Sequence, residues 1–275
     1  MARDIAVRAE QLWCAYNSKF ILRDVSFSVN RAEIAVIAGV NGVGKSTLLA
    51  VVAGAASAAR GTVSVFGYPR RTSVESERAA RRMVVYLPDE AWLPRAMTIR
   101  EYLGAAAALF DIATAEAIDR IDSLLELFSL TEAESQTLRS LSTGQRKKVG
   151  LCSALLADRD LLLLDEPFSG GLDPAGIAAL RRVLLSRKSQ RNQTVILTTP
   201  VAEIIAGLAD RLLILRDGTL VHDLDQNTLR KEMTNGASSA DALNALIFPD
   251  AEERIQRYLD QVPSERVTKL PEEKT

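Results

Sequence analysis

The sequence predicts an α/β fold with a mainly parallel sheet. Short apolar runs rich in valine and isoleucine recur along the chain, and some contain no polar residue, such as IAVIA (34–38) and LLLL (161–164). Uninterrupted runs of this kind are typical of strands covered on both faces. Helical patterns lie between the runs, after Lys45, Pro174 and Pro200. Strands that alternate with helices favour parallel pairing.

The ends of the chain are expected to differ from this centre. The first strands are predicted to pair antiparallel, as is the final LLILRDGTLVHD segment with its Asp217-Gly218 turn. Between about residues 98 and 156 the sequence becomes rich in alanine, leucine and glutamate at helical spacing. We therefore predict an α/β domain over 1–225 with a helical subdomain inserted at about 98–156.

The polar remainder of the chain, 226–275, is predicted to be a helical and charged C-terminal extension. Within it, AEERIQRYLDQV has the pattern of one amphipathic helix, followed by a charged tail, PEEKT. A helix of this kind packs on its own domain more often than on a lipid surface. We expect that packing here.

Composition and charge exclude several classes of protein. The chain has 275 residues, of which 47% are hydrophobic, enough for a sizeable core. Its 34 lysines and arginines are balanced by 35 acids, so the net charge of −1 provides no field to attract a polyanion. The arginine-rich segments RTSVESERAARR and LRRVLLSRKSQR lack aromatics and are predicted to be solvated helix faces. We expect no nucleic-acid partner.

Cysteine usage and hydropathy favour a protein of a reducing cytosol. Cys14 and Cys152 are far apart in sequence and form neither a metal-binding spacing nor a disulfide framework. No apolar run approaches the roughly 18 to 20 residues that cross a bilayer. The start, MARDIAVRAE, lacks the apolar core of a signal peptide. If the protein works at a membrane, we expect another chain to span it.

A phosphate-binding loop is the most specific motif of the chain. GVNGVGKS (39–46) matches G-x-x-x-x-G-K-[ST] and lies between an apolar strand and the helical pattern TLLAVVAG. Its backbone N–H groups would wrap phosphates, its lysine would add a charge and its serine would ligate Mg²⁺. The sequence therefore predicts a P-loop NTPase core. The predicted nucleotide-binding residues are Gly39, Asn41, Gly42, Gly44, Lys45, Ser46 and Thr47, with Ser46 also a metal ligand.

Two acids end a second motif, LLLLDEP (161–167). A buried strand that ends in two carboxylates can place one near Mg²⁺ and the other near an attacking water. We assign the metal role to Asp165, and the role of catalytic base or water-orienting group to Glu166. Acids at a strand end also occur as helix caps, which is the structural alternative.

Five motifs in a fixed order make the chain similar to one family. GVNGVGKS, YLPDEAWLP, LSTGQ, LLLLDEP and SGGLDP follow one another as in the nucleotide-binding subunits of ABC (ATP-binding cassette) transporters. The similarity extends from about Ile5 to about Leu224, and LSTGQ distinguishes this family from other P-loop ATPases. The resemblance implies the ABC ATPase fold, ATP and Mg²⁺ as cofactors, and transport-coupled ATP hydrolysis.

The resemblance also implies how the nucleotide is enclosed. Family members form a head-to-tail dimer in which the P-loop and acids of one subunit face the LSTGQ segment of the other. Ser142, Gly144 and Gln145, at the start of a helix, would then lie near a γ-phosphate across the interface. Tyr16 in LWCAY would stack on the adenine, although a tyrosine here is as often a packing residue. Homodimer and heterodimer both remain open.

By the same resemblance, the chain would bind a separate polytopic membrane subunit at the cytoplasmic face of the cell membrane. The partner's cytoplasmic helix would dock on the helical subdomain and the Asp89 loop. YLPDEAWLP with LSTGQ looks more like cassettes of bacterial exporters, so we expect an exporter rather than an importer. The alternatives are a soluble ABC ATPase that acts on no membrane and a nucleotide-dependent regulatory switch.

Three positions within the motifs differ from the usual family pattern. Thr143 in LSTGQ stands where glycine is common, a change that keeps the helix start. Asp89 falls at the family's glutamine position, where it would reach Mg²⁺ through water or be a solvated loop acid. The pair Gly170 and Gly171 makes DEPFSGGLDP one residue longer than DEPxSGLDP. We expect the added glycine to loosen this turn.

Pro200 is the fourth difference. It follows the strand TVILTT, where the family carries a switch histidine that contacts the γ-phosphate. Proline has no side-chain donor and no backbone N–H, so nothing at this position can donate a hydrogen bond. The chain's single histidine, His222, is predicted to be a partly exposed strand residue in TLVHDL. Proline suits the first turn of the helix VAEIIAGLA, so we expect an intact fold and slow hydrolysis.

Overall fold

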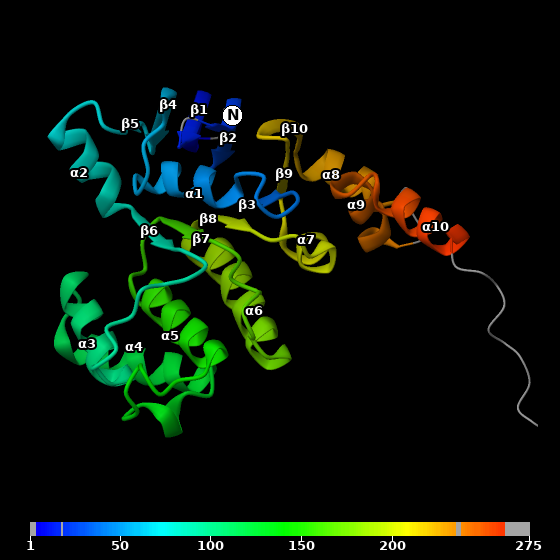
Figure 1. Cartoon of the computed structure of the whole chain (residues 1–275). Helices are drawn as coiled ribbons and strands as arrows, with labels where there is room; N and C mark the ends of the chain where they lie inside the picture. The colour runs from blue at the N-terminus through cyan, green and yellow to red at the C-terminus, as the bar shows by residue number, and fades with distance from the viewer. Residues whose placement is uncertain (1–3, 18, 235–237, 262–275) are drawn as a thin grey trace, which may run out of the picture.

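Two sheets organise the chain (Figure 1). The computed structural model describes residues 4–17, 19–234 and 238–261. The smaller sheet is antiparallel, has the order β2-β1-β4-β5, and comprises β1 (Ile5–Tyr16), β2 (Lys19–Asn30), β4 (Arg60–Val65) and β5 (Tyr68–Pro69). The larger sheet has the order β10-β9-β3-β8-β7-β6 and comprises β3 (Ile34–Ala38), β6 (Val84–Leu87), β7 (Leu161–Leu164), β8 (Thr194–Thr198), β9 (Arg211–Arg216) and β10 (Thr219–Leu224).

Strand pairing confirms the predicted α/β class. Every neighbouring pair from β9 to β6 is parallel, whereas β10 pairs antiparallel with β9. Asp217 and Gly218 form the predicted turn between these two strands, and both have positive φ, 49° and 76°. Two positive φ angles are what a two-residue hairpin loop of type I′ requires. The first strands are antiparallel, as expected.

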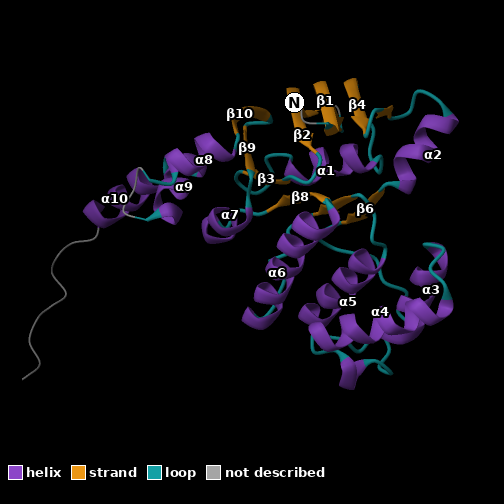
Figure 2. Cartoon of the chain, turned by 180° about the vertical axis from the view of Figure 1, so that it is seen from behind, coloured by secondary structure: helices purple, strands orange, loops and turns teal. Residues whose placement is uncertain are grey.

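The central strands are buried on both faces because their side chains alternate between two cores. In β3, for example, Val36 belongs to one core and Ile37 to the other. Figures 1 and 2 show α1 (Lys45–Ala53) on one side of the larger sheet and α5 (Thr143–Leu156) and α6 (Pro174–Arg191) on the other. This two-sided cover explains why the strands lack polar residues.

The stretch after residue 98 is helical, as its composition predicted. It contains α3 (Ile99–Leu109), α4 (Thr114–Leu127), the short 3-10 helix η1 (Thr131–Ala133) and α5. α3 begins at a capping box formed by Thr98 and Glu101. Both views place α3 and α4 farther from the larger sheet than α5 (Figures 1 and 2). Over residues 98–156, all of which are described, β pairing is limited to one isolated bridge.

The C-terminal extension contains two helices that the sequence patterns did not indicate. α8 (Gln226–Glu232) and α9 (Ser239–Ile247) contribute Leu229, Leu243 and Ile247 to one of the two cores. α9 lies against α7 (Ala202–Leu208). These two helices are therefore packed on the α/β body.

The predicted amphipathic helix is present as α10 (Ala251–Gln261), but its expected packing is wrong. Residues 253–261 are all exposed, including the apolar Ile255, Tyr258 and Leu259. The helix of the extension that lies against α7 is α9. The charged tail PEEKT lies outside the described residues.

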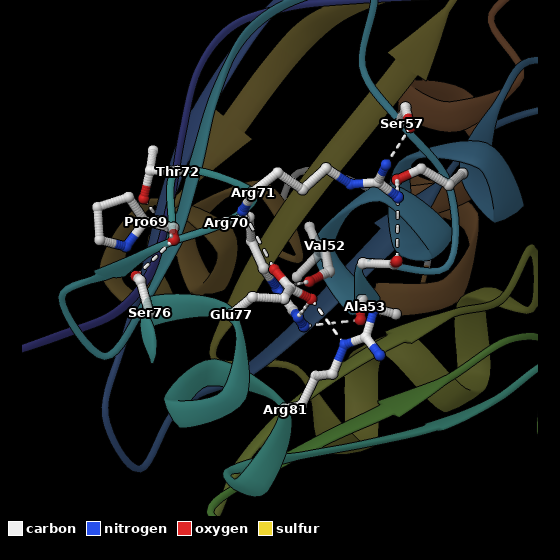
Figure 3. A network of polar contacts seen from close by, with 12 residues as sticks. Val52, Ala53, Ser57, Pro69, Arg70, Arg71, Thr72, Ser76, Glu77 and Arg81 are labelled. Atoms are coloured by element: carbon white, nitrogen blue, oxygen red, sulfur yellow. Dashed lines mark hydrogen bonds and ion pairs between the residues drawn. The ribbon is translucent and has the colours of Figure 1, made fainter. Parts of the chain in front are cut away.

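A buried arginine holds the C-terminal end of α1 (Figure 3). The last carbonyl groups of a helix have no partner within it. The Arg70 guanidinium donates to the carbonyl oxygens of Val52 at 3.2 Å and Ala53 at 2.6 Å, and it pairs with Glu77 of α2 (Val74–Arg82) at 2.8 Å. Burial lowers the pKa of Arg70, and the charge of Glu77 opposes that effect. The helix that follows the phosphate loop is thereby fixed at its far end.

Arg70→Met is expected to lower the free energy of unfolding by about 3 kcal/mol, because it leaves two carbonyls and a carboxylate without their buried donor. Arg81→Met is the matched control, since Arg81 pairs with the same Glu77 but its side chain is 68% exposed against 4% for Arg70. Its expected loss is about 0.5 kcal/mol. Urea denaturation followed by circular dichroism measures both values, and equal losses would contradict the capping role.

Candidate functional site

Three loops meet at one edge of the larger sheet because their strands run parallel. β8 lies between β3 and β7, with Thr198 opposite Ile37 and Leu197 opposite Leu164. The carboxyl ends of the three strands are therefore level, and the chain leaves each strand at the same edge. In open α/β sheets, ligands bind outside this edge.

The predicted phosphate loop leaves β3 and turns on three glycines. Gly39, Gly42 and Gly44 have φ of 145°, 80° and 112°, values that residues with a Cβ rarely adopt. A Cβ on Gly39 would lie 2.4 Å from the carbonyl oxygen of Leu215, whereas a Cβ on Gly42 would have no atom within 4 Å. α1 begins within this motif, at Lys45, and the first N–H groups of a helix have no partner within it. Open space beside free amides and a helix N-terminus fits a phosphate group.

Lys45 connects this loop to the predicted catalytic acid. Its side chain is 4% exposed, and its ammonium donates to the carbonyl oxygens of Gly39 at 3.0 Å and Val40 at 3.3 Å. The same ammonium lies 3.5 Å from Oε1 of Glu166. Because a buried cation is costly without partners, these oxygens fix its position. The other residues predicted for the loop are exposed or half-buried: Asn41, Ser46 and Thr47.

A threonine hydroxyl joins the two acids that follow β7. Asp165 is 2% exposed, and its Oδ1 accepts a hydrogen bond from Oγ1 of Thr198 at 2.6 Å. The backbone N–H of Glu166 donates to the same hydroxyl at 2.7 Å. Neither acid caps α6, because its N-cap is Asp173. The alternative interpretation, in which these acids are helix caps, therefore does not apply to α6.

A magnesium ion shared with a nucleotide stays a prediction for the neighbourhood of Asp165. Among the described residues, no group of three or more histidine, cysteine, aspartate or glutamate side chains could hold a metal ion. Mg²⁺ in nucleotide sites needs only one or two protein oxygens, because phosphates and waters complete its coordination. Ser46 and Asp165 stay the predicted ligands.

Asp89 has a partner that the sequence did not indicate. Its Oδ1 pairs with Nζ of Lys147 on α5 at 2.8 Å, and its carbonyl oxygen accepts from the same ammonium at 3.2 Å. Lys147 is buried and also lies 3.5 Å from the carbonyl oxygen of Asp165. Burial, together with the charges of Asp165 and Asp89, raises the pKa of Tyr86 to about 12. Asp89 is thus an ion-paired acid rather than a free solvated one, and any metal role would compete with Lys147.

The LSTGQ segment forms the start of α5. Ser142 is the N-cap and forms a capping box with Gln145: Oγ accepts from the Gln145 N–H at 3.2 Å, and Oε1 of Gln145 accepts from the Ser142 N–H at 2.9 Å. A Cβ on Gly144 would lie 2.4 Å from the carbonyl oxygen of Gly171. The lengthened DEPFSGGLDP turn therefore approaches α5 closely at Gly171, and its expected looseness stays a prediction.

A second lysine of α5 is also part of this edge. Lys148 pairs with Asp173 at 2.7 Å, and this hydrogen bond, followed by one from the Gly176 N–H, lowers the pKa of Asp173. Both α5 lysines are buried. The motifs did not single them out, because the two lysines continue the polar start of the helix, TGQR, and nothing in the local pattern shows that they are buried.

A family model described as ABC transporter matches residues 22–169. The chain belongs to the ABC transporter family. The aliphatic sulfonates import ATP-binding protein of Corynebacterium glutamicum is 33% identical over 76% of this chain and 80% of its own length. The lipopolysaccharide export system ATP-binding protein of Haemophilus influenzae is 29% identical over 78% of this chain and 88% of its own length. A solved structure of the ATP-binding subunit of an ABC transporter has a TM-score of 0.78 at 29% identity, covering 88% of this chain and 99% of its own.

These comparisons confirm the resemblance and the ABC ATPase fold. The chain is an ATP-binding subunit of the family, and ATP hydrolysis is the family's general activity. The matched residues include the P-loop, LSTGQ and the acids after β7, whereas Gly170, Gly171 and Pro200 lie beyond them.

Pro200, Tyr16 and His222 are the remaining residues for which the sequence made a prediction. Pro200 precedes α7 instead of standing in its first turn, because the extended Val201 is the N-cap and its N–H donates to Oγ1 of Thr199 at 3.2 Å. Tyr16 is 71% exposed at the end of β1, and its stacking on adenine stays a prediction. His222 is half-buried in β10, as expected.

Gly42→Ala is expected to weaken MgATP binding at least 10-fold, because the new methyl group would occupy the open space of the phosphate loop. Gly67→Ala is the matched control: Gly67 has a φ of 83° and likewise no atom within 4 Å, but it lies in the turn between β4 and β5. Both variants should lose about 1 kcal/mol of stability from left-handed strain. Calorimetric titration distinguishes them, and similar affinities in the two variants would refute the assignment of the loop.

Proposed function

We propose that this subunit hydrolyses ATP to drive a separate polytopic membrane subunit of an ABC transporter. The observation that carries the proposal is the polar network from Lys45 through Glu166 to Asp165, with contacts of 2.6 to 3.5 Å at the edge of the larger sheet. The network supports the proposal because phosphoryl transfer needs a cation, a base and a metal ligand close to one another.

Each residue of the network has a proposed role. Lys45 and the amides of the loop would hold the β- and γ-phosphates, and Ser46 with Asp165 would hold Mg²⁺. The bound metal would neutralise charge that develops on the phosphates. Glu166 would orient the attacking water or accept its proton.

A head-to-tail dimer is proposed to complete the site. The N-terminus of α5, with Ser142 and Gly144, would face the nucleotide held by a second cassette. The capping box uses Oε1 of Gln145 as an acceptor, so a side-chain contribution of this residue across the interface would come from its Nε2 amide group. A second copy of this chain and a different cassette both fit this arrangement.

The membrane partner is proposed to dock in a groove between the Asp89 loop and α5. The groove has a volume of about 1010 Å³, and its lining includes Asp89, Trp92, Arg95, Arg139 and Arg146. Trp92 is 84% exposed, and exposed tryptophans and arginines are enriched in protein interfaces. No helix among the described residues is suited to cross a bilayer.

Export is the proposed direction of transport, on the similarity of YLPDEAWLP and LSTGQ to exporter cassettes. Overall identity does not decide the question, because the import and export relatives named above are 33% and 29% identical. The proposed location is the cytoplasmic face of the cell membrane, where the partner would hold the subunit.

Hydrolysis is proposed to be slow because of Pro200. It follows β8 by two residues and cannot donate a hydrogen bond to a γ-phosphate. Losing one positioned donor typically costs on the order of 100-fold to 1000-fold in rate. A subunit of this kind would bind MgATP and dimerise but depend on a second cassette for fast turnover.

Pro200→His is expected to raise the ATP turnover of the purified chain about 100-fold, measured as phosphate release. The gain should disappear in the Pro200→His, Glu166→Gln double variant. Family-typical turnover in the unmodified chain, unchanged by the substitution, would disprove the impairment. MgATP binding without turnover in any variant would favour the regulatory switch.

Trp92→Ala is expected to reduce recovery of the membrane subunit with the tagged chain at least 10-fold, as for an interface hot spot. Leu109→Ala is the control, because Leu109 on α3 is 82% exposed but does not line the groove. Detergent extracts of the source membranes, analysed by mass spectrometry, provide the measurement. Recovery of soluble proteins alone would favour the soluble ABC ATPase.

A further inference from the structure

Thr198 is the last residue of the central strand β8, which carries three apolar residues between two buried threonines. All five residues of β8 are buried, and Thr198 is 0% exposed. The strand lies between β3, which leads to the phosphate loop, and β7, which leads to the two acids. A hydroxyl in such a place requires hydrogen-bond partners.

The geometry determines how this hydroxyl is used. The Glu166 N–H can only donate, so Oγ1 of Thr198 accepts its hydrogen bond at 2.7 Å. The single hydroxyl proton is then directed to Oδ1 of Asp165 at 2.6 Å, a distance typical of a hydroxyl bound to an ionised carboxylate. One side chain on β8 therefore holds both acids of the neighbouring strand.

Glu166 needs this support because of its backbone conformation. Its φ is 44°, and a non-glycine residue keeps a left-handed conformation only where its surroundings impose it. Ser169 donates to the Glu166 carbonyl oxygen from its N–H at 3.1 Å and from Oγ at 2.8 Å. The residue is thus held at its N–H by Thr198 and at its carbonyl by Ser169.

Neighbouring residues of the same segment do not duplicate the contact. Oγ1 of Thr199 accepts from the Val201 N–H at 3.2 Å, in the turn toward α7. Pro200 has no donor. Among the hydrogen bonds of the described residues, Thr198 provides the side chain that contacts both Asp165 and Glu166.

We propose that Thr198 is a positioning residue for magnesium binding and hydrolysis. Its hydroxyl fixes one oxygen of Asp165, which leaves the other for Mg²⁺, and it fixes the backbone from which the Glu166 side chain extends. This inference rests on the proposed function and adds a residue to it. Since Pro200 contributes no donor, the end of β8 acts on the site through Thr198.

The test compares two threonines of the same strand. Thr198→Val keeps the side-chain shape and removes the hydroxyl, and Thr198→Ala repeats the removal should the valine variant fold poorly. Thr194→Val is the matched control, because Thr194 is also 0% exposed and its Oγ1 accepts from the Ala32 N–H at 3.1 Å, at the opposite end of β8. Thr198→Ser keeps the hydroxyl.

ATP affinity is measured by calorimetry with Mg²⁺ and with EDTA, and turnover by phosphate release. Thr198→Val is expected to raise the Mg²⁺ concentration for half-maximal ATP binding about 10-fold and to lower turnover about 10-fold or more, with metal-free ATP affinity unchanged. Thr194→Val should match the unmodified chain in both, and Thr198→Ser should restore most of both values.

Three results are decisive. If Thr198→Val and Thr194→Val show equal Mg²⁺ dependence and equal turnover, the positioning role of Thr198 is overturned. The proposed function would still stand in that case, provided that the unmodified chain binds MgATP. An equal loss of affinity with Mg²⁺ and with EDTA would show a merely structural role and also overturn it. Absence of MgATP binding by the unmodified chain would overturn the proposed function itself.

Discussion

Parallel pairing of β3, β8 and β7 is the constraint on which the rest of the site depends. Because these strands end at one edge, the loop at 39–46, the acids after Leu164 and the end of β8 meet there although they are far apart in sequence. Parallel strands require cover on both faces, and the two cores provide it. The apolar strands and the polar edge are thus two consequences of the same arrangement.

Two lysines buried at this edge have charged and carbonyl partners within the chain. Lys45 is held by two carbonyl oxygens and Glu166, and Lys147 by Asp89 and two carbonyl oxygens. An ammonium without such partners would cost several kcal/mol. The groups are consequently fixed in position, which is the condition under which electrostatic interactions contribute most to catalysis.

Periodicity and motifs were sufficient to predict the fold class, because strand burial and the Asp217-Gly218 turn depend on local sequence. They did not predict features that depend on distant contacts. α9 was missed because its apolar residues are buried by packing that involves the distant helix α7, and the amphipathic pattern of α10 did not reveal that this helix is exposed. α7 starts at a valine without a side-chain cap, so no capping residue marked the boundary after Pro200. The partners of Thr198 and Lys147 lie on other elements, and one sequence does not reveal such pairs.

Lys147 connects the groove proposed for the membrane partner with the site proposed for hydrolysis. It lines the groove, and its ammonium contacts both the Asp89 carboxylate and the carbonyl oxygen of Asp165. A partner that displaced the Asp89 loop would have to separate this ion pair or move the lysine with it. A buried ammonium left unpaired is strongly destabilising. Moving Lys147 together with the loop therefore costs less free energy than separating the ion pair. Movement at the groove would then reach the backbone of a proposed metal ligand through one side chain, without a rearrangement of the sheet.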